Sequence, residues 1–293
     1  MGEPVRRRTR IAPGALAAWA SAVPFIVMTG LLLGGAAVWL GVASVQSRAG
    51  GYTTEAWATA FDNPRNVDSI VNSLIISAVI ATIAVLVGTP LALAIATASR
   101  GRDVSVAIAN AAANFGGASL AVAWIATLGT FGFVRLTVSS VFGWSIPVEL
   151  SSLSGYVVVY CSFVVPLYVL LMLPGAGVLR AQFWEAAQCC GASRLRYWRR
   201  VGLPVLAPFM VSGWVLSFTW AAGQYSVPFA LVGETPAESL ITLRIGELLF
   251  SAIGGSLRFQ QAAVYSVLLV AVSLVALVCY QLGTRRVLRW VET

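Results

Sequence analysis

Residues 69–99 read SIVNSLIISAVIATIAVLVGTPLALAIATAS, a run of 31 residues without an aspartate, a glutamate or an arginine. A helix needs about 20 mainly apolar residues to cross the hydrocarbon core of a bilayer. Strands of a membrane barrel would instead alternate in polarity over segments of about 10 residues. Because backbone groups in lipid must be satisfied within the segment itself, this run predicts a transmembrane helix.

Five more apolar runs of similar length lie before and after this one, and each is long enough for a transmembrane helix. These runs contain no acidic or basic residue and cover residues 11–47, 104–134, 150–179, 201–233 and 259–284. The chain of 293 residues is 58% hydrophobic and only 10% charged, whereas soluble domains carry roughly 25% charged residues. We therefore expect an all-α, polytopic membrane protein with about six transmembrane helices. The first run is too long for the core of a cleaved signal peptide, so it is expected to stay as a helix.

The arginines give the orientation of these spans. All 19 basic residues are arginine, and 14 of them fall on one side of the membrane if the N-terminus is placed inside, against 5 on the other. Cytoplasmic loops carry the excess of positive charge, so both termini are predicted to be cytoplasmic. This gives a tail over 1–15, a single transmembrane domain over 16–284 with a cytoplasmic loop at 180–204, and a tail over 285–293. The net charge of +8 then indicates contact with anionic lipid, with no role for nucleic acid.

The sequence lacks the residues and motifs that usually provide catalysis, metal binding or nucleotide binding. The chain has no histidine, and its four cysteines (Cys161, Cys189, Cys190, Cys279) do not have metal-site spacing. It also has no glycine-rich phosphate loop ending in Lys-Ser or Lys-Thr. We predict no catalytic residues, no metal site and no enzyme activity. If ATP drives this protein, another chain must bind the ATP.

The longest predicted cytoplasmic loop holds a spaced pattern of small and apolar residues. Glu185-Ala186-Ala187 is followed, after three residues, by Gly191. Nine residues separate Gly191 from Val201, and one residue separates Val201 from Leu203-Pro204. Small side chains let a helix fit closely into a groove, and glycine permits a bend there. Ser193 is placed to cap a second short helix, which Leu203-Pro204 should end because proline disfavours helix at the residue before it. The pattern predicts a helix–turn–helix below the membrane.

This pattern resembles the signature of permease subunits of binding-protein-dependent type I ABC importers, with Val201 where isoleucine is usual. The resemblance implies the fold of those permeases and a place in the inner membrane. It implies that Glu185, Ala186, Ala187, Gly191, Leu203 and Pro204 couple the chain to an ATPase dimer that binds ATP and Mg. It also implies two further partners: a second permease subunit, different or identical, and an extracytoplasmic substrate-binding protein.

Two other stretches extend the resemblance over roughly residues 50–285. Asn72-Ser73 and Gly88-Thr89-Pro90-Leu91-Ala92 look like the family's entry segment. The stretch 223–228, GQYSVP, resembles the branch that imports polyamines, ferric iron, sulfate, thiamine or phosphonates. The fourth and fifth spans line the pathway in this family, which makes five residues pathway candidates: Tyr156, Tyr160, Trp220, Gln224 and Tyr225. The same residues also fit helix packing or an aromatic belt at the lipid interface.

Two alternatives stay open from the sequence. Within the family, the chain also fits a permease for sugars. Outside it, the chain could be an ATP-independent carrier or channel, although such proteins usually place ionisable residues in the middle of their spans. The six runs are free of such residues, which favours the ATP-driven importer.

Overall fold

The computed structural model describes residues 22–46, 51–144, 146–179, 181–232, 240–250 and 255–289. Apart from an isolated bridge between Gln46 and Tyr52, these residues form helices and the turns that join them. The elements are η1 (Gly30–Gly34), α2 (Gly35–Val45), α3 (Glu55–Asp62), α4 (Pro64–Thr97), α5 (Arg102–Asn114), α6 (Gly117–Leu128), α7 (Phe133–Phe142), α8 (Leu153–Val178), α9 (Ala181–Cys189), α10 (Arg194–Tyr197), η2 (Trp198–Gly202), α11 (Leu203–Ala222), α12 (Ser226–Val232), α13 (Ile241–Phe250) and α14 (Gly255–Arg289).

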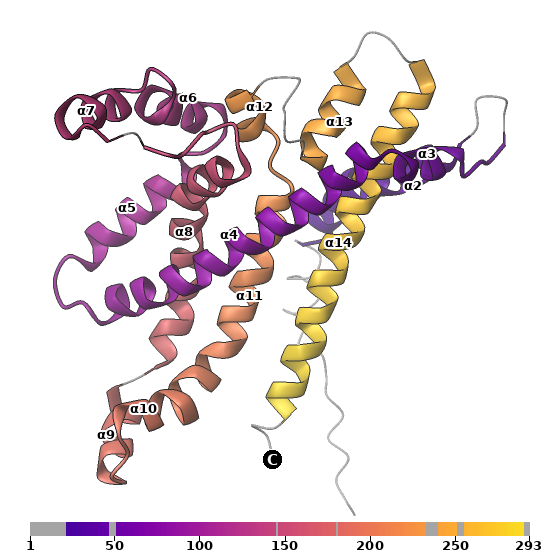
Figure 1. Ribbon diagram of the computed structural model, residues 1–293. Coiled ribbons are helices and arrows are strands. Elements are labelled where there is room, and N and C mark those ends of the chain that lie inside the picture. Colours follow the sequence, from indigo (N-terminus) through magenta and orange to yellow (C-terminus); the bar gives the residue numbers. More distant parts are fainter. Residues whose placement is uncertain are drawn as a thin grey trace, which may run out of the picture.

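Six helical segments are long and apolar enough to cross a membrane, which confirms the predicted all-α fold with about six spans. They are Ala22–Val45, Pro64–Thr97, Gly117–Phe142, Leu153–Val178, Arg194–Ala222 and Arg258–Gln281. Figure 1 shows α9 and α10 at one end of the molecule, together with the C-terminal end of α14. We call this the loop end; α6, α7, α12 and α13 lie at the opposite end (Figure 1).

The third apolar run, 104–134, departs from the expected single helix, because it holds most of α5, all of α6 and only the first two residues of α7. Gly117 has a φ of +73°, a conformation that L side chains rarely adopt, and it separates α5 from α6. Gly129 ends α6: a Cβ built there would lie 2.4 Å from the carbonyl oxygen of Ile125. The candidate span of this region is Gly117–Phe142, so the predicted run 104–134 begins 13 residues before it, in α5, and ends eight residues short of its end.

Three long helices, α4, α8 and α11, form the core, and Tyr168 of α8 lies where they meet. Its ring is sandwiched between two glycines: a Cβ on Gly88 of α4 would lie 2.4 Å from the ring, and a Cβ on Gly213 of α11 would lie 2.5 Å from it. The Tyr168 hydroxyl also shares a 2.8 Å hydrogen bond with Thr89 Oγ1. Small residues that let helices approach closely are the usual packing device in membranes. Here they admit one aromatic ring between three helices.

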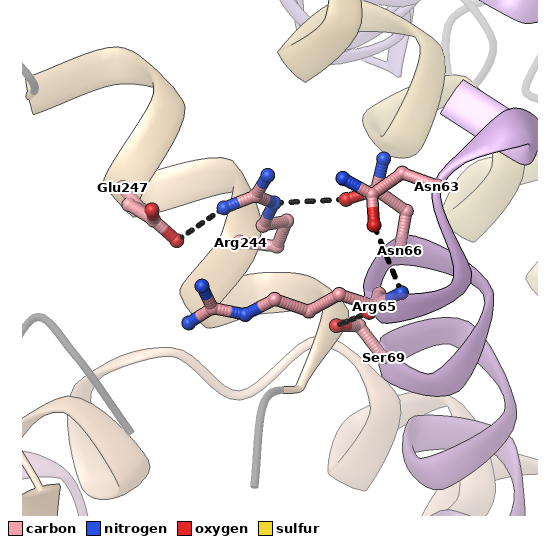
Figure 2. Close-up of polar contacts among 6 residues, drawn as sticks. All are labelled: Asn63, Arg65, Asn66, Ser69, Arg244 and Glu247. Atoms are coloured by element: carbon pink, nitrogen blue, oxygen red, sulfur yellow. Dashed lines mark hydrogen bonds and ion pairs between the residues drawn. The ribbon is translucent and has the colours of Figure 1, made fainter. Parts of the chain in front are cut away.

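A polar group ties α13 to the start of α4 at the end opposite the loop end (Figure 2). Asn63 begins α4, since its side-chain oxygen accepts from the backbone N–H of Arg65 at 3.0 Å. Arg244 of α13 donates from Nε to Oδ1 of the buried Asn66 at 3.0 Å, and from Nη1 to Glu247 Oε2 at 2.6 Å. The Arg244–Asn66 bond therefore links the two helices, beside a second bond in which the Ile241 N–H of α13 donates to Ser73 Oγ of α4 at 2.8 Å.

Replacing Arg244 should loosen α13 from α4. The Arg244→Ala variant leaves the buried Asn66 amide without this donor, which typically costs about 1–3 kcal/mol. The Glu247→Gln variant is the control, because a partly exposed ion pair contributes about 1 kcal/mol or less. Hydrogen exchange of α13 amides in detergent should rise in the first variant and change little in the second. Equal protection in Arg244→Ala and the unmodified protein would show that the bond does not hold α13.

Candidate coupling site

The first arm of the predicted loop is α9, and it ends in a turn that requires glycine. Gly191 has a φ of +70°. Its N–H bonds to the Gln188 carbonyl and the N–H of Ala192 bonds to the Ala187 carbonyl, both at 2.9 Å. This pair of bonds is a Schellman motif, which closes a helix on a left-handed residue. No atom lies within 4 Å of a Cβ built on Gly191, so the requirement is conformational and not steric.

The second arm starts at Ser193 and runs without interruption into the fifth span. The Ser193 side chain accepts from the N–H of Arg196 at 3.4 Å and so caps α10, as predicted. The expectation that Leu203-Pro204 ends this arm is wrong, because Leu203 is helical (φ −63°, ψ −45°) and opens α11. The π-helical turn η2 lies directly before it. This wide turn accommodates Pro204, which lacks an N–H and whose ring would crowd the carbonyl four residues back.

The two arms are held together by aromatic rings. Trp184 of α9 meets Tyr197 of α10 edge to face, with ring centroids 5.2 Å apart, and Tyr197 meets Trp198 at 5.8 Å. The Arg194 guanidinium lies 6.0 Å from the Trp184 ring. We call α9, the turn at 190–193 and α10 the loop hairpin. Sequence reasoning missed Trp184 and Tyr197, since their contact depends on the angle of the turn.

The six predicted coupling residues do not form one cluster. Glu185, Ala186 and Gly191 are exposed on the loop hairpin, while Ala187 is half-buried. Leu203 and Pro204 are also exposed but lie at the start of α11, beyond η2. The exposed part of the hairpin therefore offers a carboxylate beside small side chains, a surface that another protein can approach closely.

The pathway candidates differ in exposure. Tyr156 and Tyr160 are buried in the core of the chain, and the Tyr160 hydroxyl donates to the Gln224 carbonyl at 3.4 Å. Tyr225 packs so closely on α13 that a Cβ on Gly246 would lie 2.5 Å from its ring. Trp220 is 51% exposed. Trp220 therefore lies on the surface of the chain, whereas Tyr156 and Tyr160 belong to its packed core.

Comparison with known proteins identifies the family of this chain. Residues 124–291 match the family described as the inner membrane component of binding-protein-dependent transport systems. The chain is 33% identical over 78 residues to the sulfate transport system permease protein CysT of Salmonella typhimurium, a match that covers 27% of this chain and 28% of that protein. It is 28% identical over 214 residues to a putative ABC transporter permease protein, ORF1, of Streptomyces antibioticus, covering 68% of this chain and 86% of that one.

The fold is also that of a solved transporter. A bacterial ABC transporter that imports the acidic polysaccharide alginate superposes with a TM-score of 0.70 and 17% sequence identity, covering 92% of this chain and 96% of its counterpart. The same transporter in complex with an alginate-bound periplasmic protein gives a TM-score of 0.70 at 18% identity, with 93% of this chain and 95% of that one covered. At this identity the likeness establishes the fold alone. The family match covers more than half of the chain, and the chain therefore belongs to the inner membrane components of binding-protein-dependent transport systems, as a multi-pass permease subunit of an ABC importer.

Proposed function

We propose that this chain forms half of a translocation pathway for a small polar solute and is coupled to a separate ATPase through the loop hairpin. The observation that carries the coupling role is the exposure of Glu185 and Ala186 on a hairpin at one end of the bundle (Figure 1). The hairpin is shaped by a glycine turn and a serine cap, so it presents one fixed surface. A fixed surface loses little conformational freedom when it docks, which favours binding.

The partners follow from what this chain lacks. ATP and Mg belong on the ATPase dimer, because the sequence has no phosphate loop. A second permease subunit would complete the pathway, and a substrate-binding protein would deliver the solute. The alginate transporter of the same fold forms a complex with an alginate-bound periplasmic protein. We place the chain in the inner membrane with both termini in the cytoplasm. The loop hairpin then lies on the cytoplasmic side, where the excess of arginine also falls.

The solute is proposed from the pathway residues and the relatives. Trp220 offers an exposed aromatic face, and the half-buried Gln224 follows two residues after the end of α11. Tyr156, Tyr160 and Tyr225 would reach the solute only when α8 or α13 moves. The stretch 223–228 and the partial similarity to CysT support a small polar solute of the sulfate, polyamine, phosphonate, thiamine or ferric class over a sugar.

Reversing the charge of Glu185 tests the coupling role. Glu185 is exposed, so Glu185→Arg should leave insertion and folding intact while ATPase retention on the affinity-purified permease falls about tenfold. Glu55→Arg makes the same charge change on α3, away from the loop hairpin, and serves as the control. ATPase recovery with each variant is measured by quantitative mass spectrometry. Equal ATPase recovery with both variants would contradict the assignment of Glu185 to the docking surface.

A further inference from the structure

A surface groove lies between the loop hairpin and the ends of α4 and α8. Leu93 and Ala94 of α4 and Leu179, which follows α8, line it on the side of the bundle, and its volume is about 410 Å³. Binding sites for small molecules usually have volumes of about 300–1,000 Å³. The groove therefore has room for a ligand.

The groove lies at the level where the apolar spans end. The run without charged residues that contains most of α4 ends at Ser99, the run that contains α8 ends at Leu179, and an arginine follows each of them in the sequence. The hydrocarbon core of a bilayer gives way to phospholipid headgroups where such apolar runs stop. A ligand in this groove is therefore at the depth of the headgroups.

Arg194 supplies the charge of the groove. Its guanidinium lies 6.0 Å from the centroid of the Trp184 ring, and Trp198 lines the same side. Within the described parts of the chain, no carboxylate lies within 4.0 Å of this guanidinium, since the ion pair found there joins Arg244 to Glu247. A guanidinium matches the geometry of a phosphate with two parallel hydrogen bonds, and indole rings favour the membrane interface.

The segments beside the groove have a strong excess of positive charge. The segments 98–103 and 181–202 hold two and four arginines, against one acidic residue each. All six of these arginines are exposed. Basic clusters next to the ends of transmembrane helices attract anionic headgroups. The charge of this surface therefore favours an anionic ligand over a neutral one.

An exposed apolar stripe runs from the groove along α4. Leu86, Pro90 and Ala94 are four residues apart, so they lie on one face of the helix, and all three are exposed. The stripe belongs to the spanning segment Pro64–Thr97, where acyl chains are the solvent. A ligand that uses both Arg194 and this stripe needs an anionic group joined to a long apolar tail, and a free phosphate ion has no such tail.

We propose that the groove binds an anionic phospholipid, with its phosphate on Arg194 beside Trp184 and Trp198 and one acyl chain along the stripe on α4. Glu185 and Ala186 do not line the groove, so the lipid leaves the proposed docking surface of the loop hairpin free. The inference rests on the proposed cytoplasmic placement of the hairpin at the membrane surface. It does not depend on the docking of the ATPase.

Native mass spectrometry of the full chain tests the charged part of the site. The chain is titrated in detergent with phosphatidylglycerol, and separately with phosphatidylcholine of the same acyl chains, which should bind about tenfold more weakly. Arg194→Gln should weaken the binding of phosphatidylglycerol about tenfold, a usual effect of losing a hydrogen bond to a charged group. Arg196→Gln removes the same charge from the same helix outside the groove, so it should change the affinity less than about twofold.

A second pair of variants tests the apolar part without changing a charge. Ala94→Trp puts an indole into the groove at the top of the stripe, and it should also weaken the binding of phosphatidylglycerol about tenfold. Ala111→Trp makes the same change at an exposed position of α5 outside the groove and should leave the affinity unaltered. Because both alanines are exposed, neither substitution overpacks the core.

The remaining outcomes separate this site from other occupants and from the coupling role. Equal affinity for phosphatidylglycerol within either pair of variants would show lipid that merely coats the spans, and would overturn the site. Loss of the lipid from the assembled importer, when the isolated chain retains it, would show that the ATPase fills the groove and would overturn it as well. If the importer retains no ATPase, the proposed coupling fails, while the titration of the chain still decides whether the lipid site exists.

Discussion

The Gly191→Val variant should insert normally and lose at least nine-tenths of its ATP-driven transport. Gly191 holds a φ of +70° in the turn of the loop hairpin, and the left-handed region costs an ordinary L residue about 1–2 kcal/mol. A β-branched residue fits there still less well. Since about 1.4 kcal/mol is a factor of ten, the ratio of hairpins in the docking shape to hairpins in other shapes would fall about tenfold. Uptake by proteoliposomes that contain the assembled importer measures the loss.

Gly191→Asn is the matched control for this result. Asparagine tolerates the left-handed region better than other L residues with a side chain, and a Cβ at this position meets no atom of the chain. We expect Gly191→Asn to keep a large part of the transport that Gly191→Val loses. If the two variants fail equally, the position is sensitive to bulk, as at a contact with the ATPase, and not to backbone conformation. Normal transport by Gly191→Val would remove the turn from the coupling mechanism.

The Gly88→Leu variant should destabilise the three-helix core by about 3 kcal/mol, the upper part of the usual range for overpacking. The first added carbon would already lie 2.4 Å from the ring of Tyr168, and Gly213 stops the ring from moving away on its other side. The helices must therefore separate to make room. Unfolding by SDS titration, followed by the loss of helical circular dichroism or by fluorescence, measures the change.

Two variants delimit the cause of this destabilisation. Gly177→Leu places the same side chain on α8 at an exposed position where a Cβ meets nothing, so it should unfold at or slightly above the SDS concentration of the unmodified protein. Tyr168→Phe removes the bond to Thr89 but keeps the ring, and should cost only about 0.6 kcal/mol, a typical value for such bonds in membranes. Similar behaviour of Gly88→Leu and Gly177→Leu would show that the ring can relocate.

The parts of the fold that depend on long, uniform patterns could be predicted from the sequence. The six apolar runs follow from composition, and the place of the loop hairpin follows from the spacing between Glu185 and Pro204. The Ser193 cap could also be predicted, because a cap depends on residues three positions apart. Each of these features is local or repeated many times, so tertiary contacts have little chance to override it.

The parts that the sequence did not specify depend on contacts between distant segments or on a small local balance. Leu203-Pro204 reads as the end of a helix, but the π turn before it admits the proline and the helix continues. Gly117 and Gly129 lie at helix boundaries inside the third run, which its uniform apolar character does not show. The meeting of Trp184 with Tyr197 depends on the shape of the intervening turn. The burial of Tyr156 and Tyr160 depends on how α8 rotates against its neighbours. Periodicity alone does not specify these arrangements.

The ring of Tyr168 between two glycines has a consequence for how this sequence can diverge. A larger residue at position 88 or 213 is admissible only after position 168 has become smaller, and a smaller residue at 168 leaves a void until one of the glycines grows. Each single step passes through a less stable protein, while the combined exchange can keep the total volume. We therefore expect the three positions to vary together across relatives, so that their order of substitution is constrained by epistasis and not by the solute carried.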